Sequence, residues 1–140
     1  MSSNLFTTVA KGIIFNEDKF LIVKRSSKSS NGATWEIPGG KLENSETINE
    51  CLRREVREEV GLGIEVVKFL YGWKIPRINR KSTVGYTYLC KTSGKEVLLS
   101  REHSEYAWIS PSEIDDFEFG KGIKRDFSNL KWNNLLDWIR

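Results

Sequence analysis

Three glutamates within five residues are the side chains of this sequence best placed to do chemistry. Glu55, Glu58 and Glu59 stand three and four residues apart, so a helix would bring them onto one face within an arc of about 100°. Like charges at such spacing repel each other. Clustered carboxylate oxygens without cysteine or histidine ligands suit Mg²⁺, with Mn²⁺ as the alternative. The spacing therefore predicts a divalent-metal site.

Apolar residues of the same segment favour a metal site over a solvated acidic helix. Projected onto a helix they form one stripe, which consists of Ile48, Cys51, Leu52, Val56 and Val60. Glu55 and Glu59 fall within the span of this stripe, and Glu58 lies at its edge. Carboxylates crowded against a buried face cost free energy unless a positive charge compensates them. A solvated helix would carry its acids on the opposite side.

The segment from residue 40 to residue 62 resembles the signature of the Nudix hydrolases. That signature has a glycine, five residues, a glutamate, seven residues, and then Arg-Glu-apolar-x-Glu-Glu-x-Gly-apolar. The chain has Gly40, Glu46 and then REVREEVGL at residues 54–62. The preceding WEIPG, residues 35–39 and called here the lead-in segment, is similar to that of the MutT-type branch. The resemblance covers roughly residues 6–116 and implies hydrolysis of a phosphoanhydride bond by water and divalent metal.

The resemblance also implies a metal shell. Glu55, Glu58 and Glu59 would bind Mg²⁺, and the carbonyl of Gly39 would be a further ligand. MutT-type enzymes use another glutamate in a later loop, six residues before a tryptophan, and Glu102 holds that position. Glu102 would complete the metal shell or act as general base. Which glutamate takes the proton from the attacking water stays open.

Two further acids and one arginine have predicted roles near the metal. Arg54 and Glu46 would brace the loop against the helix, because a guanidinium makes strong forked hydrogen bonds with carboxylates. Arg54 is therefore included among the catalytic residues. Glu105 is the alternative to Glu102, and an exposed loop acid is the simpler interpretation of either.

Substrate contacts are less sharply indicated. Arg25 and Lys41 align with basic positions of MutT-type enzymes and are predicted to contact phosphate. Tyr86, or the aromatic residues that alternate along residues 67–75, could stack on a base, although core packing explains most of them equally well. The basic residues in 77–81 are better explained as solvated charges. Residues 117–122 read FEFGKG, without the asparagine that reads a purine in MutT-type enzymes, so purine specificity is not implied.

Composition limits the expected domain number, binding partners and cellular location of the protein. A chain of 140 residues with 39% hydrophobic content has the size of one domain, spanning 1–140. Its formal charge of +3 does not single out nucleic acid as a partner. Two cysteines are too few for a disulfide framework, and no segment has the length or hydrophobicity to cross a bilayer. We expect a cytoplasmic protein with a small-molecule nucleotide substrate and no membrane partner; a homodimer is consistent with the family resemblance.

The glutamate helix needs other elements to position it. Thr47 and Glu50 form a predicted capping box, and Gly61 is a natural stop. Residues 26–33 read as a loop. The capping box and proline in residues 110–113 predict a short helix there, and residues from 122 onward read as one amphipathic helix. Strands are predicted at 6–15, 19–25, 64–75, 82–90, 96–99 and 106–109. The mixture implies an α/β fold, an α/β/α sandwich with a mixed sheet between helices, as in the Nudix fold.

Three functions are compatible with these features. The first is a nucleoside triphosphate pyrophosphohydrolase that releases the monophosphate and pyrophosphate. The second is an ADP-ribose or nucleotide-sugar pyrophosphatase, for which Pro76 is weak support. The third, of another class, is a Nudix-like domain that binds nucleotide or RNA without cleaving it. Such domains often lose glutamates of the signature, whereas this chain keeps all of them.

Overall fold

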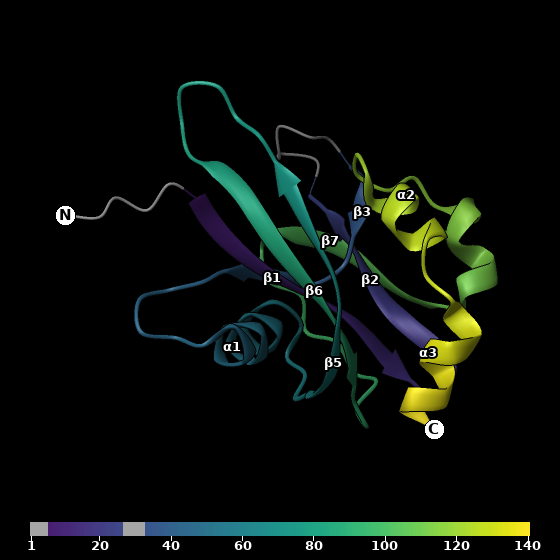
Figure 1. The fold of residues 1–140 in the computed structure, drawn as a ribbon. Helices are drawn as coiled ribbons and strands as arrows, with labels where there is room; N and C mark the ends of the chain where they lie inside the picture. The colour runs from purple at the N-terminus through teal and green to yellow at the C-terminus, as the bar shows by residue number, and fades with distance from the viewer. Residues whose placement is uncertain (1–5, 27–32) are drawn as a thin grey trace.

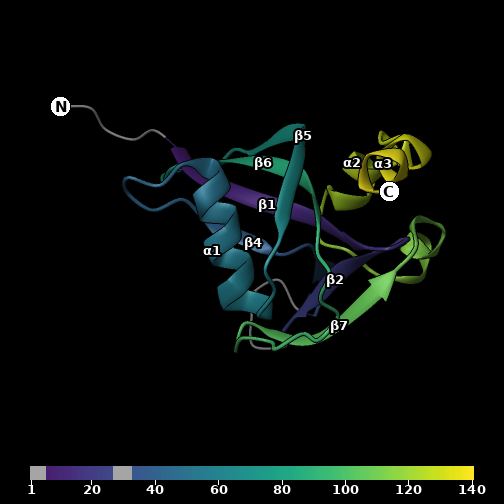
Figure 2. The same ribbon diagram turned by 90° about the horizontal axis from the view of Figure 1, so that it is seen from below.

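A mixed β-sheet forms the middle layer of the molecule, with helix α1 on one face and helices α2 and α3 on the other (Figures 1 and 2). The computed structural model describes residues 6–26 and 33–140. Most of the predicted loop at 26–33 therefore lies outside the described residues. The predicted α/β/α sandwich is confirmed.

The sheet is organised around one long central strand. Strand β1 (Phe6–Asn16) pairs in parallel with β6 (Ser82–Lys91), and antiparallel with β2 (Lys19–Arg25) and β4 (Gly39–Lys41). Strand β2 also pairs with β3 (Trp35–Glu36) and β7 (His103–Ile109), while β5 (Glu65–Ile75) pairs with β6. Strand β1 thereby connects the lead-in segment to the rest of the sheet.

Two hydrophobic cores follow from the alternation of β1. Ala10 and Ile14 face α1 (Ile48–Val60) and join the core built on Leu52, Val56 and Val60. The alternate residues Ile13 and Phe15 join the second core, under α2 (Ile123–Ser128) and α3 (Trp132–Ile139). Because neighbouring residues of a strand point to opposite faces, one strand supplies both cores.

Helix α1 begins and ends as predicted. The Thr47 hydroxyl accepts a hydrogen bond from the Glu50 amide at 3.1 Å, and the Glu50 carboxylate accepts one from the Thr47 amide at 2.9 Å. Gly61 ends the helix with a φ of 74°, a left-handed conformation that costs glycine little. The capping box and the glycine stop set the length of the helix that carries the glutamates.

The predicted strand at residues 96–99 is wrong. This segment instead runs along the end of α1, where the amides of Leu98 and Ser100 donate to the carbonyls of Val60 and Glu59, each at 3.0 Å. The last carbonyls of a helix lack partners within the helix. The segment satisfies two of them, so its hydrogen bonds go to α1 rather than to the sheet.

The single predicted C-terminal helix is two helices. Helix α2 ends at Ser128 and α3 begins at Trp132, following the predicted short helix, which is the 3-10 helix η1 (Pro111–Asp116). Phe127 and Trp132 both contact the ring of Phe20, at centroid distances of 5.8 and 5.2 Å. Five residues along an unbroken helix turn a side chain by about 140°, so the break is what allows both rings to reach Phe20.

We predict that Thr47→Ala lowers the free energy of unfolding by about 1 kcal/mol, because the Glu50 amide at the start of α1 loses its acceptor. Urea unfolding followed by circular dichroism measures this. Thr47→Ser, which keeps the hydroxyl, is the matched control and should remain close to the wild type. Equal losses in the two variants would contradict a role for the capping bond.

Candidate active site

The three glutamates of α1, called here the helix glutamates, differ strongly in exposure. Glu59 is only 7% exposed, the side chain of Glu55 is 16% exposed, and that of Glu58 is 60% exposed. Glu55 and Glu59 sit where the apolar stripe of α1 meets the sheet, while Glu58 reaches solvent. Two carboxylates are thus held at a buried boundary with a third beside them.

Strand β4 lies directly against these carboxylates. The amide of Gly39 donates to Glu59 Oε1 at 3.1 Å. A Cβ added to Gly40 would stand 2.3 Å from the carboxyl carbon of Glu55. The two glycines therefore let the backbone approach α1 as closely as the sequence suggested.

Gly39 is required for a second reason. Its φ of 149° lies in a region that residues with a Cβ rarely adopt, and an added Cβ would stand 2.0 Å from the backbone oxygen of Ala10. Strand β4 pairs with β1 at this point, with Gly39 opposite Lys11. Because residue 39 is a glycine, β4 can pair closely with β1 while the amide of the same residue donates to Glu59.

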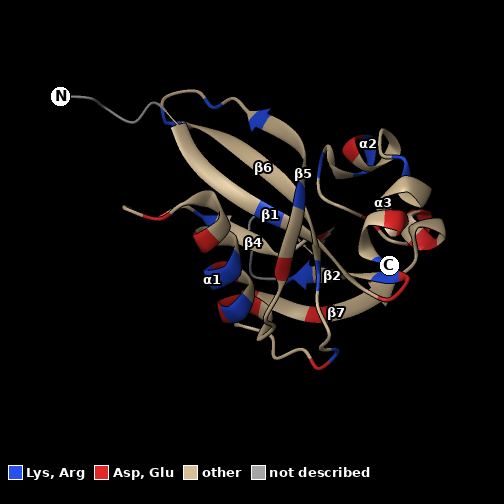
Figure 3. Cartoon of the chain, turned by 60° about the horizontal axis from the view of Figure 1, so that its bottom comes forward, with Lys and Arg blue, Asp and Glu red and all other residues tan. Residues whose placement is uncertain are grey.

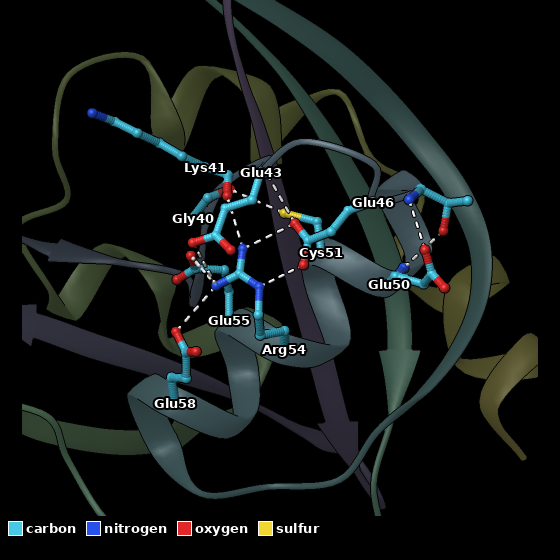
Figure 4. Close-up of polar contacts among 10 residues, drawn as sticks. Gly40, Lys41, Glu43, Glu46, Glu50, Cys51, Arg54, Glu55 and Glu58 are labelled. Atoms are coloured by element: carbon cyan, nitrogen blue, oxygen red, sulfur yellow. Dashed lines mark hydrogen bonds and ion pairs between the residues drawn. The ribbon is translucent and has the colours of Figure 1, made fainter.

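Arg54 lies at the centre of the polar contacts around the helix glutamates (Figure 4). Its Nε and Nη2 donate to the two carboxylate oxygens of Glu46, at 2.5 and 3.0 Å. Its Nη1 donates to Glu55 at 3.0 Å and to Glu58 at 3.1 Å. Nη2 also donates to the carbonyl of Lys41 at 3.1 Å. One guanidinium thereby joins the loop after β4 to two helix glutamates.

These contacts perturb the carboxyl groups in opposite directions. The hydrogen bonds from Arg54 lower the pKa of Glu46 to about 2. Burial raises the pKa of Glu55, although Arg54 opposes the effect, and burial raises the pKa of Glu59 to about 7. Lys11 is the charge that most opposes the rise at Glu59. Glu55 and Glu59 are therefore costly to keep ionised where they are.

A divalent cation fits the chemistry of this donor set. Carboxylate oxygens that are partly buried and short of positive charge suit a hard cation such as Mg²⁺ or Mn²⁺. Among the residues that the structure describes, no three acidic, histidine or cysteine side chains converge on one point. Arg54 accounts for this, because it draws Glu55 and Glu58 to its Nη1 while Glu59 turns to Gly39.

The structure separates Glu102 from Glu105. Glu102 comes just before β7, and its charge contributes to the raised pKa of Glu55. Glu105 instead pairs with Lys24 at 3.3 Å on the exposed surface. The segment that runs along the end of α1 brings Glu102 towards the helix glutamates. The prediction of a strand at 96–99 gave no indication of this placement.

The two predicted phosphate contacts, Arg25 and Lys41, have different surroundings in the structure. Arg25 ion-pairs with Glu36 at 3.4 Å. Lys41 contributes its carbonyl to Arg54, while its side chain points away from the cluster (Figure 4). The basic residues of 77–81 lie in the exposed connection between β5 and β6 (Figure 3).

The predicted aromatic wall of β5 is not continuous. Register shifts after Val66 and Phe69 interrupt the alternation. Phe69 contacts the ring of Tyr86 at 6.2 Å, on the side of the sheet that faces α1. Trp73 lies on the other side, where its Nε1 donates to Thr87 at 3.1 Å. Tyr86 therefore shares a face with α1 but not with Trp73.

Sequence reasoning missed a buried charged cluster beside the lead-in segment. Glu36 accepts a hydrogen bond from His103 at 2.7 Å and ion-pairs with Lys11 at 3.6 Å and with Arg25 at 3.4 Å. Burial raises the pKa of Glu36, but Lys11, His103 and Arg25 outweigh it and lower that pKa to about 2. The available signal was Lys11 itself, the one charged residue of β1.

Comparison with known proteins shows which family this chain resembles in sequence and structure. The NUDIX domain model matches residues 6–130. A MutT-like protein of Streptomyces ambofaciens is 33% identical over 115 residues, which cover 82% of this chain and 71% of the relative. The nucleoside triphosphatase NudI of Escherichia coli O139:H28 is 27% identical over 140 residues, covering 92% and 97%. The crystal structure of a MutT protein from Methanosarcina mazei Go1 superposes with a TM-score of 0.79 at 26% identity, covering 92% and 94%.

The α/β/α sandwich and its carboxylate helix define a hydrolase of phosphoanhydride bonds. The chain belongs to the Nudix family, and its relatives and structural neighbours make it a MutT-type Nudix hydrolase.

The neighbouring glycines of β4 should respond differently to the same added methyl group. We predict that Gly39→Ala lowers the free energy of unfolding by about 2–4 kcal/mol, because its Cβ would meet the backbone of β1. Gly40→Ala should cost under about 1.5 kcal/mol, because only the mobile end of Glu55 must shift. Urea unfolding of both variants measures the difference. A larger loss for Gly40→Ala would contradict this account.

Acid should remove the stabilisation that Glu36 supplies. Its pKa is lower in the folded protein, about 2, than its ordinary value of 4.5, so its ionisation stabilises the fold above about pH 4.5 and less as pH falls towards 2. We predict that the wild type has a larger free energy of unfolding than Glu36→Gln. This difference should be constant above about pH 4.5 and should shrink as the pH falls from 4.5 towards 2. Urea unfolding at a series of pH values tests this; a constant difference down to pH 2 would contradict it.

Proposed function

We propose that this Nudix hydrolase is a Mg²⁺-dependent nucleoside triphosphate pyrophosphohydrolase, which converts a nucleoside triphosphate and water to the monophosphate and pyrophosphate. The observation that carries the proposal is the juxtaposition of the helix glutamates with Gly39 and Gly40 of β4. This arrangement offers hard oxygen donors at a boundary that needs positive charge.

Each part of the site has a proposed task. The helix glutamates, the carbonyl of Gly39 and Glu102 would hold Mg²⁺ or Mn²⁺. The bound ion would neutralise phosphate oxygens and lower the pKa of a water molecule. Glu58, Glu59 or Glu102 would take the proton from that water. Arg54, braced by Glu46, would keep the helix and the loop after β4 in register.

The choice of triphosphates rests on similarity along most of the chain. NudI, aligned over 92% of this chain, is named a nucleoside triphosphatase, and the Methanosarcina mazei structure is that of a MutT protein. Pro76 is an exposed residue directly after β5. Arg25, Lys41 and Tyr86 stay proposals as substrate contacts.

The cellular setting belongs to the same proposal. We infer a cytoplasmic enzyme with a small nucleotide substrate, alone or as a homodimer. Both cysteines are free and buried, which is compatible with a reducing compartment. Among the described residues, the helices are all too short or too polar to cross a membrane.

A substrate panel tests the reaction directly. Purified protein with Mg²⁺ should release pyrophosphate from at least one nucleoside triphosphate, measured by ³¹P NMR, and activity should disappear with EDTA. A preference for ADP-ribose would choose the nucleotide-sugar alternative. Binding of nucleotide without turnover of any member of the panel would favour the non-catalytic class.

Charge-neutral variants test the assigned carboxylates. Glu58→Gln and Glu59→Gln should each lower kcat by about 100-fold or more at saturating Mg²⁺. Glu102→Gln should also lose activity, whereas Glu105→Gln, which alters only an exposed ion pair with Lys24, should not. Initial rates measure all four. Loss of activity in Glu105→Gln but not in Glu102→Gln would reverse the assignment of the loop glutamate.

A further inference from the structure

Lys11 is an unusual residue for its position in the sheet. It lies in the middle of β1 between Ala10 and Gly12, and its side chain is only 18% exposed. The Nζ atom lies 3.3 Å from the carbonyl of Ile37 and 3.6 Å from Glu36 Oε1. Both partners belong to the lead-in segment. The side chain of Lys11 therefore connects the central strand to the segment that leads into β4.

Backbone hydrogen bonds attach the same segment to the same strand. The amide of Gly12 donates to the carbonyl of Pro38 at 2.9 Å, and Gly39 stands opposite Lys11 in the pairing of β1 with β4. The amide of Gly39 then donates to Glu59. Contacts thus run without interruption from the ammonium group of Lys11, through the lead-in segment, to the most buried helix glutamate.

Charge explains why a lysine is tolerated here. Withdrawing an ammonium group from water costs free energy unless anionic groups compensate it. Glu36 supplies one such charge, and His103 and Arg25 hold Glu36 in place. The ammonium group is thereby compensated by a carboxylate that belongs to the lead-in segment itself.

We propose that Lys11 is a positioning residue of the metal site, which holds the lead-in segment so that Gly39 meets Glu59 in the geometry that metal binding needs. The inference rests on the proposed function in taking Gly39 and Glu59 as parts of that site. Lys11 acts through these two residues rather than on the substrate. Residues that orient metal ligands commonly change metal affinity by about 10–100-fold when replaced.

Lys11→Met tests the proposal, because methionine keeps the length and the β1 packing but loses the charge and the donor. In metal-free protein, hydrogen exchange at the Gly39 amide should become about tenfold faster. Binding of Mn²⁺ without nucleotide, followed by electron paramagnetic resonance, should weaken by about tenfold. Lys11→Arg should recover most of both losses. Lys91→Met is the control, a strand lysine of β6 that pairs with Glu65 of β5, and it should behave as wild type in both measurements.

The proposal is overturned if folded Lys11→Met keeps two quantities within about twofold of the wild type. These are the rate of hydrogen exchange at the Gly39 amide and the affinity for Mn²⁺. Circular dichroism and thermal unfolding establish whether the variant folds; should it fail to fold, Lys11→Gln compared with Lys11→Arg decides by the same two measurements. Faster Gly39 exchange and weaker Mn²⁺ binding, together with a wild type that hydrolyses no nucleotide, would uphold the positioning role while rejecting the proposed reaction. A wild type that binds no Mn²⁺ would also overturn the proposal, because Lys11 would then have no metal site to position.

Discussion

The withdrawal of two carboxylates from water, those of Glu55 and Glu59, is the constraint on which the rest of this structure depends. An ionised carboxylate at a buried boundary is unfavourable unless hydrogen bonds or positive charges compensate it. Here the compensation is divided. Glu55 receives a hydrogen bond from Arg54, whereas Glu59 receives one from the Gly39 amide and feels the charge of Lys11. The compensation at Glu59 is incomplete, since its pKa stays at about 7.

Incomplete compensation is what suits the site to a cation. A fully neutralised cluster would have nothing to gain from Mg²⁺, whereas these glutamates would gain charge balance from the proposed ion. Arg54 adds a conformational element, because its Nη1 contacts both Glu55 and Glu58. The mostly exposed Glu58 can leave this contact at little cost, while Glu46 continues to hold the other edge of the guanidinium. Arg54 can therefore stabilise the helix without blocking its ligands.

Strand β1 links the two sides of the site. Its backbone pairs with β4, its residues Ala10 and Ile14 pack under α1, and Lys11 contacts the lead-in segment. Of these contacts, the pairing with β4 is the one that brings Gly39 to Glu59. This common anchor explains why glycines that fit closely against β1 and α1 are as important to the site as the acids themselves.

Local patterns predicted what depends on local geometry, and the failures lie where distant segments compete. The capping box at Thr47, the stop at Gly61 and the burial pattern of the helix glutamates depend on one helix and its period, so the sequence alone was sufficient for them. Residues 96–99 have a strand-like pattern, but the free carbonyls at the end of α1 took their hydrogen bonds. The C-terminal helical pattern was correct in period, yet the packing of two rings on Phe20 divided it.

The sequence by itself determined the class of chemistry, because the spacing of acids along one helix and the glycines before it are local properties of the chain. Only the tertiary structure decided which neighbours those acids have. It placed Glu102 rather than Glu105 near Glu55, and it gathered Lys11, Glu36 and His103 from three different strands. Sequence spacing carries no information about such contacts, since they arise from strand pairing and loop paths between residues far apart in the chain.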